Sequence, residues 1–215
     1  MRRRDALMTL IAGAGGLATG GCHWLTAWAI APRHPTAKVK QEYPLEADRL
    51  AIIIYCGTDT LFNYPTAGLE ISRDLVNEIL LHLKGRVREI LHPVEVAQWQ
   101  ESNLEWPNLS LGELALRFKV DTVLYLEIEQ YTGVEERSAN LLRGRIKARI
   151  QVAKAAAAHN PVYETHIETV FPEDRPVGVL EYSERKILSD VGVLFSRAVI
   201  RKFYDHEVEV KGGKA

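Results

Sequence analysis

Residues 142–152 have the sequence LRGRIKARIQV, in which apolar or small side chains alternate with charged or polar ones. Successive side chains of a β-strand point to opposite faces of a sheet, so this stretch predicts a strand with one buried and one charged face. Two further alternating runs flank it in the chain, at 123–131 and 162–171. The polar faces of these two runs carry acidic side chains, namely Glu127, Glu129, Glu164 and Glu168.

Charge complementarity predicts how these three strands are ordered. Opposite charges on neighbouring strands attract by roughly 0.2–1 kcal/mol per pair, and like charges repel. A basic strand between two acidic strands satisfies this rule, so we expect an antiparallel meander with 142–152 in its centre. The row of cations from Arg143 to Arg149 otherwise suggests an anion-binding strip, but the facing acids favour neutralisation across the strands.

The chain before the meander alternates strands with helices. Residues 50–56 form an almost unbroken apolar run ended by Gly57, which is typical of a central strand covered on both faces. Apolar residues at four-residue spacing from Ile71 to Leu83 predict a helix that ends before Gly85. The remaining predicted elements are a strand at 86–91 and helices at 94–100, 110–118 and 183–204. The sequence therefore predicts an α/β (α+β) fold: a mixed sheet with a C-terminal antiparallel three-strand meander and helices packed on one or both faces.

Composition limits the classes of function. The 215 residues include 27 basic and 28 acidic side chains, a net charge of -1, and this length suits one compact domain with extensions. Binding to nucleic acid relies on a basic surface that releases counterions, so we expect no nucleic-acid partner. Two cysteines are too few for a disulfide scaffold or a four-thiolate zinc site.

Residues 1–22 have the features of an export signal. Arginines at positions 2–4 precede an uncharged run at 6–31, and this resembles a twin-arginine signal. Residues 17–22, LATGGC, resemble the lipobox of bacterial lipoproteins, in which the cysteine thiol carries diacylglycerol; Thr19 stands where the lipobox usually has Leu. We therefore predict lipidation at Cys22.

Two alternatives to lipidation remain open. The run at 6–31 exceeds the ~20 residues that span a bilayer, so it can stay as an uncleaved anchor. Cleavage after the A-x-A motif at 27–29 would instead release the domain. All three alternatives place the domain on the periplasmic side of a bacterial membrane.

Whether Cys56 is a free thiol or part of a disulfide depends on whether Cys22 is acylated. If Cys22 is acylated, Cys56 is an unpaired thiol in an oxidising compartment, and we expect it to be buried at the end of its strand. The competing interpretation is a disulfide between Cys22 and Cys56, which is incompatible with acylation.

The chain divides into four parts on these grounds. The export signal at 1–22 is followed at 23–47 by an apolar and then proline-rich tether without regular periodicity. Residues 48–205 form the single α/β domain, and we expect 206–215 to be a disordered tail.

The order of elements resembles a superfamily of envelope lipoproteins. It includes the penicillin-binding-protein activator of the outer membrane, the Pel polysaccharide lipoprotein, the curli secretion subunit and the N-terminal domain of the Tol periplasmic protein. The similarity lies in the strand containing Ile52–Ile54, the segment 118–124 in place of "lgaDyvl", and the long two-stranded return. The turn at 155–160 departs from the usual "d-x-x-t-G". The resemblance implies a non-enzymatic role, either docking on an envelope protein or assembling into rings.

Catalytic chemistry is poorly supported by the sequence. Cys56 ends a central strand, where ligands often bind, but no histidine has a spacing that suggests a base for a thiol-dependent hydrolase. His166 and Glu168 share one strand face without an identifiable third metal ligand. We therefore expect no catalytic residue, metal or cofactor, and keep a small enzyme centred on Cys56 as the alternative.

Aromatic residues are concentrated in two connections of the domain. Phe62 and Tyr64 follow the first strand, and Trp99 and Trp106 precede the capped helix at 110–118. Aromatic anchors contribute much of the energy of protein interfaces, so we predict that these four residues bind a partner. The alternative is that they pack over the hydrophobic core beneath the loops. The predicted function is a membrane-anchored binding module that docks on another envelope protein, with a ring-forming homo-oligomer as the alternative.

Overall fold

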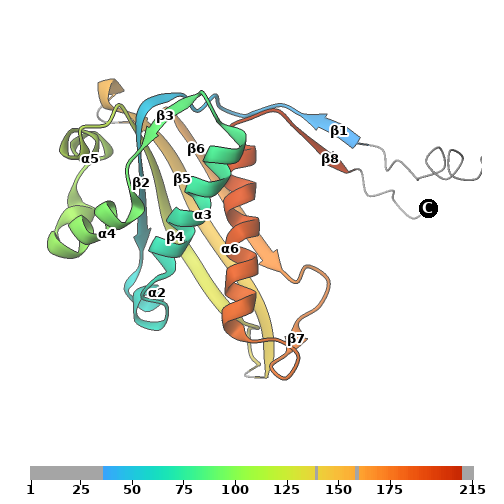
Figure 1. The fold of residues 1–215 in the computed structure, drawn as a ribbon. Coiled ribbons are helices and arrows are strands. Elements are labelled where there is room, and N and C mark those ends of the chain that lie inside the picture. Colours follow the sequence, from blue (N-terminus) through green and yellow to red (C-terminus); the bar gives the residue numbers. More distant parts are fainter. Residues whose placement is uncertain (1–35, 139, 158–159, 210–215) are drawn as a thin grey trace, which may run out of the picture. The chain divides into compact units, whose positions relative to one another are not determined.

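The computed structural model describes residues 36–138, 140–157 and 160–209. Residues Lys38–Glu207 form a compact unit built on a six-stranded mixed sheet of order β3-β2-β4-β5-β6, in which β7 pairs with β5 (Figure 1). The strands are β2 (Ala47–Cys56), β3 (Val87–Ile90), β4 (Thr122–Val134), β5 (Leu141–Lys154), β6 (Tyr163–Phe171) and β7 (Val177–Gly178). β2 runs parallel to β3 and β4, and the later pairs are antiparallel. The predicted mixed sheet with its C-terminal meander is confirmed.

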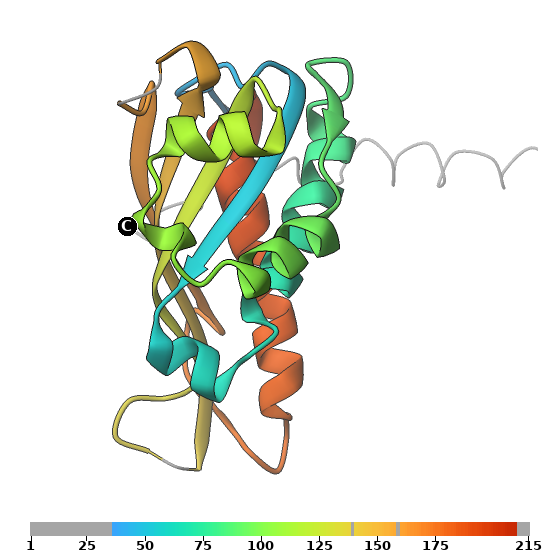
Figure 2. The same ribbon diagram turned by 90° about the vertical axis from the view of Figure 1, so that its left-hand side faces the viewer.

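Helices cover both faces of the sheet. Figure 1 shows α3 and α6 side by side on one face, and Figure 2 shows α4 and α5 on the other. The helices are α2 (Thr58–Asn63), α3 (Ala67–His82), α4 (Pro93–Ser102), α5 (Leu111–Phe118) and α6 (Glu184–Arg201), with 3-10 turns at Trp106–Asn108 and Ala155–Ala157. The larger core fills the α3–α6 side, where Ile52, Leu75 and Phe195 are fully or almost fully buried. A smaller core around Ile53 and Leu114 lies on the α4–α5 side.

Local sequence features account for the ends of these helices. The Ser110 hydroxyl accepts from the Glu113 N–H at 3.3 Å, and the Glu113 carboxylate accepts from the Ser110 N–H at 2.7 Å. These two bonds form a capping box at the start of α5. Gly85 follows α3 with a φ of 87°, a left-handed conformation that glycine adopts without a Cβ clash. Ser183 is the N-cap of α6, and its hydroxyl accepts from the Lys186 N–H at 3.3 Å.

The charged face of the meander is neutralised across its strands. Lys147 lies 2.8 Å from Glu129 on β4, Arg145 lies 2.6 Å from Glu168 on β6, and Arg149 pairs with Glu127. The apolar residues between these cations on β5 are buried. The predicted arrangement, with the basic strand at the centre of two acidic strands, is confirmed.

The two ends of the described chain form strands where the sequence pattern gave no sign of regular structure. β1 (Thr36–Val39) and β8 (His206–Glu209) pair with each other in a two-stranded sheet. Neither strand has a buried face, so no apolar periodicity marks them. The stretch before β2 also differs from the expected tether, because Leu45 is fully buried in the larger core.

The predicted export signal, the lipidation site Cys22, the alternative anchor at 6–31 and the first part of the tether lie outside the described residues. Among the helices that the structure does describe, none is long and apolar enough to cross a membrane.

Asp121 joins the starts of β2 and β4 and makes the stability of the domain depend on pH. Its carboxylate accepts from the Arg49 N–H at 2.6 Å and from the Thr122 hydroxyl at 2.8 Å. Burial alone would raise the pKa of Asp121, but hydrogen bonds from backbone N–H groups and the Thr122 hydroxyl outweigh it and lower the pKa below its ordinary value.

A carboxyl group with a lowered pKa stabilises the fold above the pKa of the unfolded chain, about 3.9, and loses this effect as the pH falls through the folded pKa. Asp121→Asn should therefore cost about 1 kcal/mol at neutral pH, and this difference from the wild type should shrink below about pH 4. Urea denaturation from pH 7 to pH 3 measures it. A difference that stays constant over this range would contradict the assignment.

Candidate functional site

A cleft opens at the C-terminal end of β2, between α3 and α4. It has a volume of about 410 Å³, within the ~300–1,000 Å³ typical of ligand pockets. Its walls come from the end of β2, the start of α3, the inner side of α4 and the segment 104–107. Since β2 and β3 are parallel, the connections that follow them both leave from the carboxyl ends of the strands. Open α/β sheets bind ligands at this end.

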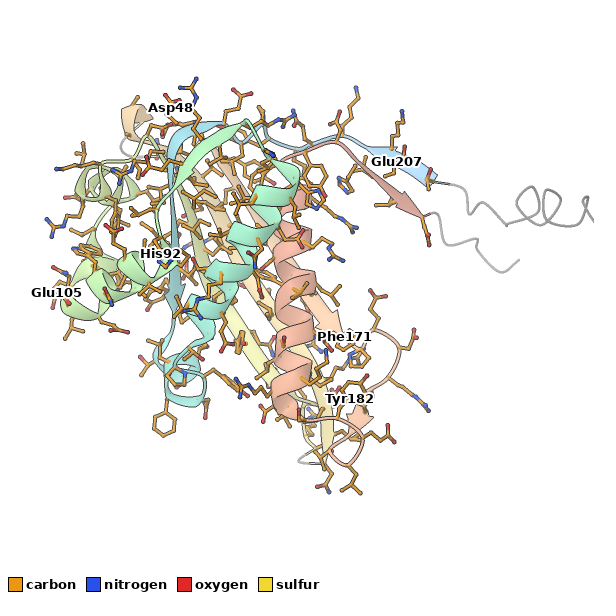
Figure 3. All side chains as sticks on the ribbon, in the orientation of Figure 1. Asp48, His92, Glu105, Phe171, Tyr182 and Glu207 are labelled. Atoms are coloured by element: carbon orange, nitrogen blue, oxygen red, sulfur yellow. The ribbon has the colours of Figure 1, made fainter. Side chains whose placement is uncertain are left out.

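The lining of the cleft is mainly apolar. Ile54 and Cys56 line it from β2, Leu61 lines it from α2, and Leu104 and Trp106 line it from the connection after α4. Figure 3 labels one residue from each of the two segments that contribute to the walls after β3: the His92 ring caps the start of α4, and Glu105 precedes the 3-10 turn that begins at Trp106. Two connections distant in the sequence thus meet in one cleft.

Two of the four predicted partner-binding aromatics are open to solvent or to the cleft. Trp106 lines the cleft, and its ring meets that of Tyr55 edge to face at 5.8 Å. Phe62 is 86% exposed on α2, next to Leu61 of the cleft wall.

The other two aromatics make contacts inside the domain. The Tyr64 hydroxyl donates to the Glu184 carboxylate at 2.7 Å, and its ring lies 5.1 Å from that of Tyr131. Trp99 packs edge to face on Phe118 at 4.8 Å, with the Arg117 guanidinium 5.7 Å from its ring centre. Tyr64 and Trp99 therefore support the connections from which Leu61, Leu104 and Trp106 reach the cleft.

Cys56 lies in the cleft as a buried, free thiol. Burial raises the pKa of Cys56 to about 11. Since the thiolate is the nucleophilic form, very little of it is present at neutral pH. In the described ranges, no three His, Cys, Asp or Glu side chains gather to hold a metal ion. His166 lies 3.5 Å from Glu129, and Glu168 pairs with Arg145.

Polar residues that the sequence analysis did not single out also face the cleft. Ser72 is only 5% exposed, and its hydroxyl finds no hydrogen-bond partner among the described residues. The Gln100 side-chain amide donates to the Ile54 carbonyl at 3.1 Å. Gly68 and Ser72 are four residues apart and so share one face of α3. Two small residues on one face of the helix leave space beside its apolar stripe. This was the feature of the sequence that could have indicated the cleft.

The fold and the cleft define a mixed α/β domain with an open, mainly apolar cleft at the C-terminal end of β2. No protein-family model and no curated protein matches the sequence. Solved structures of similar fold include the PelC dodecamer from Paraburkholderia phytofirmans, 13% identical over 79% of this chain and 98% of that chain, with a TM-score of 0.44. Lipoprotein GNA1162 from Neisseria meningitidis is 11% identical over 71% of this chain and 96% of that chain, with a TM-score of 0.44.

A putative lipoprotein from Caulobacter crescentus is also similar, with 9% identity over 70% of this chain and 83% of that chain and a TM-score of 0.37. A minor lipoprotein from Acinetobacter baumannii is a further solved structure to which this chain is similar.

Proposed function

We propose that this protein is a non-enzymatic binding module of the bacterial envelope, tethered to a membrane, which captures a partner protein in the cleft beside β2. The observation that carries this proposal is the convergence of two sequence-distant connections on one open apolar cleft. The partner-binding residues that we propose are Phe62, Leu104 and Trp106, with Tyr64 and Trp99 holding the connections in place.

The exposure of large apolar side chains around the cleft supports this role. Leu104 is 83% exposed and Leu61 is 48% exposed, and both line the cleft. Clustered apolar exposure costs solubility and is often found where another protein binds. The raised pKa of the Cys56 thiol weighs against a thiol-dependent enzyme at the same place.

The membrane attachment in this proposal rests on the N-terminal sequence. An acylated Cys22, or an anchor at 6–31, would hold the domain on the periplasmic side, with the chain that follows as a tether. An anchored module meets partners in the same membrane at high effective concentration, so moderate affinity in the cleft is sufficient.

The proposal predicts that position 104 contacts a partner and that position 116 does not. Leu104 and Leu116 are matched, since Leu116 is 70% exposed on α5 and is not part of the cleft. A photo-crosslinking amino acid at 104 of the full chain, expressed with its own N-terminus in a bacterial membrane, should form an adduct with one envelope protein. Leu104→Ser should weaken binding of that purified partner by at least about 10-fold, while Leu116→Ser leaves it unchanged.

Equal crosslinking at the two positions would contradict the cleft as the binding site. An adduct between two copies of this chain would instead support the ring-forming alternative, which light scattering of the full chain in detergent would then confirm or exclude.

A further inference from the structure

β2 has an open edge along its C-terminal half. Its neighbour β3 is paired with it only from Ala47 to Leu50, because the chain leaves the sheet after Ile90 and enters α4 at Pro93. On the opposite side, β4 stays paired with β2 as far as Cys56. In the described part of the chain, β2 therefore has a strand neighbour on one side only from residue 51 onward.

The backbone groups on this open edge can be identified. The Leu50 carbonyl accepts from the Leu91 N–H at 2.8 Å, and the Ile54 carbonyl accepts from the Gln100 side chain at 3.1 Å, so both face away from β4. Residues of a strand direct their N–H and C=O groups to the two edges alternately. Ile52, which lies midway between Leu50 and Ile54, must therefore direct its N–H and C=O to the same open edge.

The cleft lies along this edge, and its polar groups are incompletely satisfied. Ile52, Ile54 and Cys56 all line it, together with the buried Ser72 hydroxyl that has no partner among the described residues. Gln100 supplies a side-chain amide where a neighbouring strand would supply a peptide group. Buried polar groups without hydrogen bonds are costly, so an occupant that provides hydrogen bonds is favoured here.

We infer that the cleft accepts an extended, apolar segment of the partner, which adds to the sheet as a strand along residues 52–56 of β2. This inference rests on the proposed function, because it names the partner element that the same cleft would bind. Residues 52 to 56 span about 13 Å, the length of a four- to five-residue strand. Backbone pairing supplies affinity in such strand addition, and alternate side chains enter pockets.

An extended peptide fits these groups better than an alkyl chain does. A peptide presents N–H and C=O groups alternately and can pair with Ile52 and with Ile54, displacing Gln100. An alkyl chain would fill the apolar volume but leave the Ile52 backbone and the Ser72 hydroxyl without partners. The hydrogen-bonding groups therefore decide between occupants that the apolar lining alone would admit equally.

The test uses the full chain in detergent and the probe peptide acetyl-KVTVTVK-amide at millimolar concentration. Hydrogen exchange at the amides of Ile52 and Ile54 is measured with and without the probe. We expect exchange at both amides to slow by at least about 10-fold on saturation, since each would then be hydrogen-bonded within a ladder.

Two N-methylated forms of the probe test backbone pairing directly. One carries methyl groups on the odd-numbered residues of the peptide and the other on the even-numbered residues, so that the side chains are unchanged. Only alternate N–H groups of an added strand face its neighbour, so one form should lose binding and the other should keep it. Equal binding of both forms would overturn strand pairing.

Gln100→Ala should strengthen binding of the probe peptide. If the Gln100 side chain only stabilised the fold, its removal would not have this effect. Without the side-chain amide, the Ile54 carbonyl is free for the incoming strand, and the probe should bind about 5-fold more tightly, the effect of one hydrogen bond of about 1 kcal/mol that no longer has to be broken. Unchanged or weaker binding would overturn the proposed path.

The remaining outcomes separate this inference from the proposed function. Absence of protection at millimolar probe, or protection by laurate but not by the peptide, would overturn strand addition. The function proposed above would still stand if crosslinking distinguishes position 104 from position 116. If the probe protects Ile52 and Ile54 but crosslinking does not distinguish position 104 from position 116, then β2 binds an added strand and the proposed binding of an envelope protein in the cleft is wrong.

Discussion

A single methyl group added at Gly144 is expected to lower the free energy of unfolding by about 1–3 kcal/mol. Gly144 lies on β5 beneath α6, and a Cβ atom there would lie 2.8 Å from Val191 Cγ1 and 3.0 Å from Ile187 Cγ2. Both neighbours are fully buried, so neither can swing out to make room. Gly144→Ala must therefore push α6 away from the sheet or strain these side chains, and urea denaturation of the full chain measures the cost.

Two controls separate this close approach from a general intolerance of alanine in strands. Gly178 on β7 has no atom within 4 Å of the corresponding Cβ position, so Gly178→Ala should change stability by less than about 0.5 kcal/mol. In a Val191→Ala background the added methyl group has space, and its cost should fall by about 1 kcal/mol. Equal costs in the two backgrounds would show that contact with Val191 is not the cause.

The meander was predictable because two separate patterns in the local sequence both specify it. Alternation from Leu142 to Val152 defines the buried face, and the signs of the charges define the neighbours. In the register of the sheet, Glu127 lies directly opposite Arg149 and Lys147 lies directly opposite Glu168, as the alternation and the charges together require. The helices α3, α5 and α6 were predictable for the same reason, since apolar spacing and capping residues lie within each segment.

Elements without a buried face were not predictable. None of the residues of α2 is buried, and β1 and β8 have no buried side, so apolar periodicity is absent from all three. Their backbone pairing depends on which segments the rest of the fold brings together. The same is true of Leu45, whose burial in the larger core is not apparent from the proline-rich sequence around it.

The candidate site was only partly predictable, because residue type does not specify the direction of a side chain. The aromatic connections were identified, but the sequence does not distinguish Trp106, which lines the cleft, from Trp99, which packs on Phe118. The open edge of β2 depends on the length of β3. The run at 50–56 predicts a strand covered on both faces, and nothing within it shows that its neighbour ends at Ile90.

The thiol of Cys56 is expected to react with iodoacetamide about a hundred times more slowly in the folded protein than in the protein unfolded by urea. Burial raises its pKa from 9.0 to about 11. Below both values, the thiolate fraction falls tenfold for each unit by which the pKa rises, and the thiolate is the species that attacks the reagent. The full chain with Cys22→Ser leaves Cys56 as the only thiol and so gives one rate.

The pH dependence of this rate separates a buried structural thiol from a nucleophile. The rate of the folded protein should increase tenfold per pH unit up to the limit of its stability, without a plateau near neutral pH. An activated cysteine beside a base would instead reach its plateau below pH 8 and react faster than the unfolded chain. That result would restore the enzyme centred on Cys56, and the cleft would then have to be interpreted as an active site rather than as the place where a partner strand is held.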